Sequence, residues 1–181
     1  MGRVFVVRHG ESEWNSGVAK RLREDVRLTE TGVAQAHSLA GIFKEISWDA
    51  IYSSPLTRAQ HTARIASSRS DILIDPRITE TYFGEMEKIE IDQKKWMDVW
   101  QEYWEGNTGL IAGAETFEDM KTRVDNFLNE ILTAHKGKDI LLVTHGGTQK
   151  FIWCYFNEHP SDSNYHKISP LGNCEYFVET F

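Results

Sequence analysis

The alternation of apolar segments along the chain predicts an α/β fold, a three-layer α/β/α sandwich around a mostly parallel mixed sheet. Four short apolar runs of strand length, which we expect to be buried, lie at 4–7, 50–52, 72–74 and 140–143, and a fifth closes the chain at 176–178. Between them lie longer segments in which apolar residues recur with helical spacing. Strands that alternate with helices of this length are typical of a parallel sheet that is covered on both faces.

Two of the helical segments have a recognisable start. In the first, apolar residues within 33–43 fall on one face of a helix that we expect to begin after Thr29. In the second, spaced apolar residues run through 117–131, and Thr116 precedes them as the expected N-cap. Asp119 stands three residues after Thr116, which is a variant of the capping box that stabilises helix N-termini.

No repeat or low-complexity linker divides the chain, so residues 1–181 are predicted to form a single domain. The segment 85–113 is the least regular part, and it could be an insert or a lid over the active site. Within it, Trp96, Trp100 and Trp104 recur every four residues, which predicts an amphipathic helix. This helix could pack on the core, cover the site or offer a surface to a partner.

The composition excludes several classes of protein. Lysine and arginine number 20 against 27 acidic residues, a formal net charge of −7, whereas nucleic acids and anionic membranes attract a basic face. The two cysteines are too few for a disulfide scaffold, so we expect free buried thiols. With no signal-type segment and no apolar run of about 20 residues, the expected location is the cytoplasm, without a membrane or nucleic-acid partner. The oligomeric state cannot be read from the sequence.

Charged and imidazole side chains follow three of the predicted strands directly. Arg8 and His9 follow the run at 4–7, Arg58 comes shortly after the run at 50–52, and His145 follows the run at 140–143. Because ligands of parallel α/β sheets bind beyond the carboxyl ends of the strands, these side chains are expected to share one pocket. A glycine follows each histidine, which lets a ligand approach the main chain closely.

The residue types in this pocket indicate phosphate chemistry. Arginine forks match phosphate oxygens in pairs and keep their charge at any working pH. Arg58 also falls near the start of a predicted helix, where backbone amides favour an anion. A transition-metal site is disfavoured because two neighbouring arginines would repel the cation and no metal-ligand spacing is present. A serine hydrolase is disfavoured because no G-x-S-x-G motif is present.

Five segments, in order along the chain, resemble the motifs of the histidine phosphatase superfamily, which has the phosphoglycerate mutase-like fold. The opening segment, RHGESEWN at 8–15, is the most specific of them. The others are 28–36, 53–59, 80–84 and 144–147. The resemblance implies a phosphatase-branch enzyme that attacks phosphate with His9 and passes through a phosphohistidine, without metal or other cofactor.

The resemblance also suggests a role for each remaining site residue. Arg8, Arg58 and His145 would bind the phosphate oxygens as negative charge moves toward the leaving group. Glu80 would be the general acid that protonates the leaving alcohol. Three further residues are candidates for substrate binding: Asn15, Gly146 and Arg21. For Asn15 the alternative is a turn cap, and for Arg21 it is a solvated loop beside acidic neighbours.

The predicted function is hydrolysis of a small phosphorylated metabolite. One alternative is phosphoryl transfer of the cofactor-dependent phosphoglycerate mutase type, although such mutases are usually longer and have a different acid loop from Glu80–Gly84. Another is a phosphoprotein phosphatase or a regulatory phosphoryl-binding protein. The Trp96–Trp104 segment suggests room for an apolar or ring-shaped leaving group.

Overall fold

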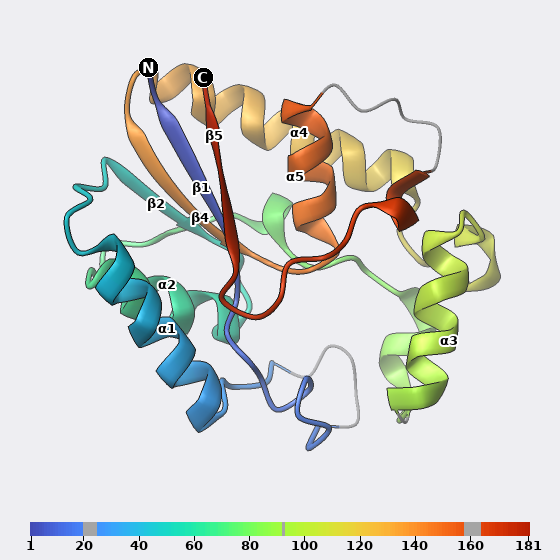
Figure 1. Cartoon of the computed structure of the whole chain (residues 1–181). Coiled ribbons are helices and arrows are strands. Elements are labelled where there is room, and N and C mark those ends of the chain that lie inside the picture. Colours follow the sequence, from blue (N-terminus) through green and yellow to red (C-terminus); the bar gives the residue numbers. More distant parts are fainter. Residues whose placement is uncertain (20–24, 92, 158–163) are drawn as a thin grey trace.

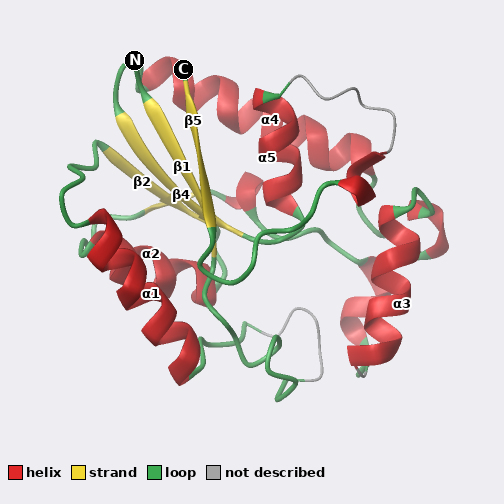
Figure 2. Cartoon of the chain, viewed as in Figure 1, coloured by secondary structure: helices red, strands yellow, loops and turns green. Residues whose placement is uncertain are grey.

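The computed structural model describes residues 1–19, 25–91, 93–157 and 164–181, and its arrangement is shown in Figures 1 and 2. The strands are β1 (Arg3–Arg8), β2 (Ala50–Ser53), β3 (Leu73–Ile74), β4 (Asp139–Thr144) and β5 (Tyr176–Thr180). The α-helices are α1 (Glu30–Phe43), α2 (Thr57–Ser67), α3 (Gln93–Trp104), α4 (Phe117–Ala134) and α5 (Thr148–Phe156). All five predicted strands are therefore present.

The five strands form one sheet in the order β3-β2-β4-β1-β5. β4 pairs in parallel with both β1 and β2, β3 is parallel to β2, and β5 runs antiparallel beside β1. The predicted mostly parallel mixed sheet is confirmed. In this register Val143 of β4 pairs with both Val7 and Ser53, so β1, β2 and β4 end at the same edge.

Helices cover both faces of the sheet, which confirms the three-layer prediction (Figure 1). Alternate residues of β1 point to opposite faces, as strand geometry requires. Phe5 and Val7 pack in a cluster with α1 and α2. Val4 and Val6 pack in a larger cluster with α4 and α5. Each buried strand therefore has an apolar cluster on both sides, and this double burial fixes its register.

The predicted helix starts are confirmed. The Thr29 hydroxyl accepts a hydrogen bond from the Gly32 backbone at the start of α1. At the start of α4, the Thr116 hydroxyl accepts from the Asp119 backbone at 3.1 Å, and the Asp119 carboxylate accepts from the Thr116 backbone at 3.0 Å. This reciprocal capping box satisfies two backbone groups that a helix terminus leaves without intrahelical partners.

Two sequence-based expectations were wrong in part. The run at 72–74 was expected to be a buried strand, but Leu73 is 49% and Ile74 44% exposed. β3 is a two-residue strand at the edge of the sheet, where it has a neighbour on one side only. Both cysteines are free as expected, but Cys154 is buried and Cys174 only partly so, because Cys174 lies in the loop before the edge strand β5.

The amphipathic helix predicted around Trp96–Trp104 is α3, and it packs on the core as one interpretation expected. Trp96, Tyr103 and Trp104 are buried in the cluster that also holds residues of β1 and β4. The Trp104 ring stacks on Phe117 of α4, with ring centroids 5.4 Å apart. That this segment also acts as a lid, and that 1–181 is a single domain, stay predictions. Along the described stretches, no helix is both long and apolar enough to cross a membrane.

Replacing the N-cap of α4 should destabilise the fold by a measurable amount. Thr116→Ala removes the hydroxyl that caps the Asp119 backbone, so the free energy of unfolding should fall by about 1 kcal/mol in urea denaturation. The matched control is Thr133→Ala in the last turn of the same helix. Thr133 is exposed and its hydroxyl bonds only to the Asn129 carbonyl within the helix, so its loss should cost little. An equal loss for both variants would contradict the capping argument.

Candidate active site

The three predicted strand ends meet in one place. Arg8 ends β1 and His9 follows it, His145 follows β4, and Arg58 lies in the first turn of α2, directly after the loop that leaves β2. The imidazole rings of His9 and His145 have centroids 5.0 Å apart, and the Arg58 Nε donates to the His9 Nε2 at 3.2 Å. The parallel register of the strands, which ends them at one edge, produces this cluster.

One hydrogen bond fixes the protonation pattern of His9. Its Nδ1 lies 2.7 Å from the Gly10 carbonyl oxygen. Because a carbonyl can only accept, Nδ1 carries the proton, and in the neutral ring Nε2 holds the lone pair. The His9 backbone is held as well, since its carbonyl accepts from the Asn173 side chain at 3.0 Å. The lone pair therefore faces Arg58 from a fixed position.

The loop after His9 lies directly against the first turn of α1, and glycines make this contact possible. A side chain at Gly10 would come within 2.6 Å of the Gly32 carbonyl oxygen, and one at Gly32 within 2.0 Å of the Glu11 carbonyl oxygen. The Gly10 backbone also donates to the Thr62 hydroxyl of α2 at 3.0 Å. The loop is thus held against α1 by close backbone contact and against α2 by a hydrogen bond to a side chain, which limits the freedom of His9.

His145 is fully buried beside the same cluster. Its Nε2 lies 2.7 Å from the Ser54 hydroxyl, while its Nδ1 has no hydrogen-bond partner among the described residues. The backbone of Gly146 comes close to Arg8, since a side chain there would lie 3.4 Å from the guanidinium carbon. A ligand between these groups would therefore meet backbone, imidazole and guanidinium at once.

Both arginines are withdrawn from solvent. Arg58 is only 6% exposed. Arg8 donates from Nη1 to the Leu171 carbonyl at 2.5 Å, and its buried Nε finds no partner in the described part of the chain. Burial lowers the pKa of Arg8, although the charges of Glu80 and Glu175 oppose that effect. Buried guanidinium groups attract an anion strongly because water screens them little.

The two histidines remain neutral in this environment. Burial is the largest cause that holds the pKa of His9 well below 6.5, and the positive charges of Arg58 and Arg8 add to it. The pKa of His145 is lowered in the same way, by burial first and then by Arg58. A neutral His9 keeps its lone pair at neutral pH, which a nucleophile needs.

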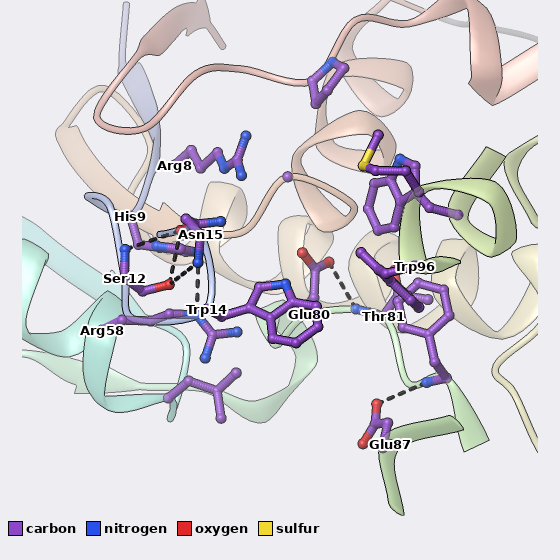
Figure 3. A pocket seen from close by; sticks show the side chains of 16 residues that line it. Arg8, His9, Ser12, Trp14, Asn15, Arg58, Glu80, Thr81, Glu87 and Trp96 are labelled. Atoms are coloured by element: carbon purple, nitrogen blue, oxygen red, sulfur yellow. Dashed lines mark hydrogen bonds between the residues drawn. The ribbon is translucent and has the colours of Figure 1, made fainter. Parts of the chain in front are cut away.

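Glu80 brings a carboxylate to the pocket from the loop between the short helices Pro76–Ile78 and Gly84–Lys88. Its Oε1 accepts from the Thr81 backbone at 2.9 Å and from the Gly147 backbone at 3.1 Å. A side chain at Gly147 would come within 2.5 Å of that oxygen, so the Glu80 carboxylate could keep this position only beside a glycine. Figure 3 shows the carboxyl group apart from His9, across the pocket.

Asn15 lines the pocket and also fulfils the turn-cap alternative. Its Oδ1 accepts from the Ser12 backbone at 3.1 Å and from the Ser12 hydroxyl at 2.9 Å. The Asn173 side chain donates to the same oxygen at 3.3 Å. These three donors fix the orientation of the amide, as the dashed lines of Figure 3 show for Ser12.

Other candidates from the sequence have different places. Arg21 lies outside the described residues, so its predicted contact with substrate stays a prediction. Glu11 and Glu13, the two acidic residues of the segment 8–15, hold the loop after β1. The Glu11 carboxylate accepts from the Thr29 hydroxyl at 2.7 Å, and the Glu13 carboxylate from the Arg27 backbone at 3.1 Å.

Sequence reasoning missed several residues of the site. Ser54 and Thr81 lie within the motif segments 53–59 and 80–84, so their membership of these motifs was the available signal, but no role was predicted for them. Trp14 belongs to the segment 8–15 and lines the pocket. Asn173 had no signal in the sequence, because the loop before β5 reaches His9 only through the antiparallel pairing of β5 with β1.

The site opens into a cavity of about 340 Å³, a volume in the range of small-molecule pockets. Its lining residues are Arg8, His9, Ser12, Trp14, Asn15, Leu56, Arg58, Glu80, Thr81, Phe83, Glu87, Trp96, Met97, Trp100, Gly146 and Pro170. Within the described ranges, no group of three or more histidine, cysteine or acidic side chains could hold a metal ion.

The buried Arg58, the partly buried Arg8 and two buried histidines lie together at the carboxyl edge of an α/β sheet, an arrangement suited to a small anion such as phosphate. The model of the histidine phosphatase superfamily (branch 1) matches residues 4–178, and the chain belongs to this superfamily. Its fold matches that of phosphoglycerate mutase-like structures.

Individual relatives agree with this assignment. Phosphoglycerate mutase-like protein 4 of Arabidopsis thaliana is 30% identical over 173 residues, which is 91% of this chain and 74% of the relative. A mutant phosphoserine phosphatase from Entamoeba histolytica, solved in complex with phosphoserine, matches with a TM-score of 0.82 and 25% identity. YhfR of Bacillus stearothermophilus matches with a TM-score of 0.82 and 27% identity. Both structural matches cover 98% of this chain and 90% of the other.

The low pKa values of the two site histidines can be tested by NMR in the ligand-free protein. From about pH 8 to about pH 6, the imidazole nitrogens of His9 and His145 should keep neutral-state chemical shifts, with the proton of His9 on Nδ1. A titration of either ring with a midpoint near the ordinary 6.5 would contradict this.

The same pKa shifts predict how stability depends on pH. The unfolded chain, with ordinary histidines, takes up protons below 6.5 that the folded site does not accept. The free energy of unfolding should therefore fall as the pH falls through this range. The His9→Gln variant, which lacks one of the two groups, should show a smaller fall in the same urea titration.

Proposed function

We propose that this chain is a phosphomonoesterase that hydrolyses a small phosphorylated metabolite through a covalent phosphohistidine at His9. The observation that supports this most is the fixed tautomer of His9. Its Nδ1 is bound to the Gly10 carbonyl, so its Nε2 keeps the lone pair, beside the Arg58 guanidinium that would bind the phosphate.

In the first step, the His9 Nε2 attacks phosphorus, and the bond between phosphorus and the alcohol oxygen breaks. Arg8, Arg58 and His145 bind the remaining phosphate oxygens, with further hydrogen bonds from the Asn15 amide nitrogen and the Gly146 backbone. Placing these donors before the reaction removes most of the cost of reorganising solvent around the transition state.

Glu80 acts as the general acid and then as the general base. In the first step its carboxyl proton moves to the departing alcohol oxygen, which would otherwise leave as a poor alkoxide. In the second step Glu80 takes a proton from water while that water attacks phosphorus and the bond to His9 breaks. Inorganic phosphate is released, and both residues return to their starting states.

The proposed reaction needs no metal ion. The charge that a divalent cation supplies in other phosphoryl-transfer enzymes is here supplied by two guanidinium groups. This part of the proposal rests on the position of Arg8 and Arg58 within the same pocket as His9.

A second candidate function is phosphoryl transfer between two hydroxyl groups, as in a mutase. It is favoured by the name of the Arabidopsis relative, a phosphoglycerate mutase-like protein. A mutase would need to keep the phosphohistidine away from water and to hold a second anionic group. Arg21, predicted above to bind substrate, is the candidate for holding that group. Isomerisation of 3-phosphoglycerate that depends on a bisphosphate primer would identify this activity.

The proposed nucleophile is tested by trapping the intermediate. Wild-type protein should release phosphate from an aryl phosphate with or without chelator, and rapid quenching with ³²P-labelled substrate should leave acid-labile label on His9. His9→Ala should lose both signals, with a rate decrease of about 10⁴-fold or more. The control is His37→Ala, an exposed histidine on α1, which should keep full activity.

Three outcomes would contradict the proposal. Release that stops with chelator would indicate a metal enzyme. Full activity of His9→Ala would exclude the phosphohistidine. Silence of the wild type toward every phosphate ester, with phosphate still bound, would indicate a regulatory phosphoryl-binding protein.

The role of Glu80 is tested by the dependence of the rate on the leaving group. Glu80→Gln keeps an oxygen that can accept from the Gly147 backbone but removes the transferable proton. With an alkyl phosphate, formation of the phosphohistidine should slow by about 10²–10⁴-fold. With 4-nitrophenyl phosphate, whose leaving group needs no proton, the burst of nitrophenol should be nearly unchanged. Equal slowing with both esters would exclude the acid role.

A further inference from the structure

Besides the charged and polar groups near His9, the pocket is lined by several aromatic and apolar side chains. We call this group the aromatic wall, and it consists of Trp14, Phe83, Trp96, Met97 and Trp100. These residues come from three separate parts of the chain: the loop after β1, the turn before the short helix Gly84–Lys88, and one face of α3. The site chemistry proposed above uses none of them.

The rings of the wall are fixed by contacts with one another. Phe83 meets Trp96 edge-on, with centroids 4.7 Å apart and an interplanar angle of 87°. Trp14 meets the same ring at 6.2 Å and 76°. Trp100 lies 5.7 Å from Phe83 and 5.3 Å from Trp104, which is buried in the core. Edge-to-face packing of this kind orders the rings before any ligand arrives.

Met97 is unusual within this group because it is 57% exposed. It stands on α3 next to the buried Trp96 and lines the same cavity. An exposed methionine at the rim of a pocket can cover an apolar ligand, since its unbranched thioether adapts to irregular shapes and packs well on ring edges. The rim therefore continues the apolar surface of the wall.

The wall and the phosphate-binding groups belong to one cavity, so a single substrate would touch both. Figure 3 shows Trp14 between the His9–Arg58 side of the pocket and Glu80, with Trp96 beyond Glu80. If Glu80 protonates the leaving oxygen, the rest of the alcohol extends from that oxygen into the space beside these rings. The wall thus meets the alcohol portion of the substrate rather than its phosphate.

We propose that the aromatic wall makes this site selective for phosphomonoesters whose alcohol carries a flat apolar ring. The inference rests on the proposed phosphatase function and adds the substrate class. Burying such a ring against fixed aromatic faces gains free energy from lost apolar surface and from favourable ring geometry. A small polar alcohol has no such ring to bury, so it gains neither of these two contributions to the binding free energy.

Three primary alkyl phosphates of similar leaving ability test this proposal: benzyl phosphate, ethyl phosphate and phosphoserine. The kcat/KM for benzyl phosphate should exceed that for each of the other two by about tenfold or more, the factor that about 1.4 kcal/mol of extra transition-state binding provides. The ring has to be held in the transition state as well as in the ground state for this ratio to appear.

Variants of the wall should reduce this selectivity. Trp100→Ala and Met97→Ala should each lower the benzyl-to-ethyl ratio of kcat/KM, by roughly 3-fold to 10-fold. Of the two variants, Met97→Ala is less exposed to a folding defect, because removing an exposed side chain leaves the fold intact. Its matched control is Ile42→Ala on α1, since Ile42 is 59% exposed and does not line the pocket. That control should leave the ratio unchanged.

Several results would overturn the proposal. A benzyl-to-ethyl ratio near one, or a ratio that neither wall variant changes, would exclude selection by the wall. A preference for phosphoserine that disappears in Arg21→Ala would show that a basic residue reads a second anionic group instead. In each case release of phosphate that depends on His9 would leave the proposed function standing, whereas no release from any of the three esters would exclude both.

Discussion

The hydrogen bond between the His9 Nδ1 and the Gly10 carbonyl is the interaction on which the rest of the site depends. It assigns the proton to one ring nitrogen and so leaves the lone pair on the other, next to Arg58. This hydrogen bond joins two residues adjacent in the sequence, but its geometry requires the loop after His9 to stay in one conformation. That conformation is held by distant groups, because Gly10 lies against Gly32 of α1 and donates to Thr62 of α2. The proposed nucleophile is therefore oriented by the packing of two helices on one face of the sheet.

The electrostatics of the pocket are local and opposite in sign to those of the whole chain. The protein carries a formal charge of −7, yet the buried Arg58 and the partly buried Arg8 place two positive charges beside two histidines. Burial and these charges together lower the pKa of His9, so the ring stays neutral while its neighbours attract an anion. An isolated cluster of this kind selects a small anion that can enter the cavity, whereas an extended polyanion would also meet the acidic surface.

Helix α3 shows how one segment can serve both the core and the pocket. Trp104 and Tyr103 stabilise the fold by packing with α4 and α5, while Trp96 and Trp100 are part of the pocket lining. From the sequence alone, packing on the core and covering the site are alternative roles for this helix. A helix with tryptophans every four residues places them on one broad face, and such a face can contact the core along one edge and the cavity along the other. The two interpretations are compatible for that reason.

The sequence by itself determined the local features of this protein and one long-range feature. Apolar runs predicted all five strands, and Thr29 and Thr116 marked two helix starts, because hydrophobic periodicity and capping are properties of neighbouring residues. The clustering of Arg8, His9, Arg58 and His145 was also predictable, since parallel strands must end at a common edge. Only the tertiary structure decided what depends on strand order and packing. It placed β3 at an exposed edge, brought Asn173 to His9 through the antiparallel β5, and assembled the aromatic wall from three distant segments. Such contacts join residues whose separation along the chain carries no local pattern, so no periodicity or motif could reveal them.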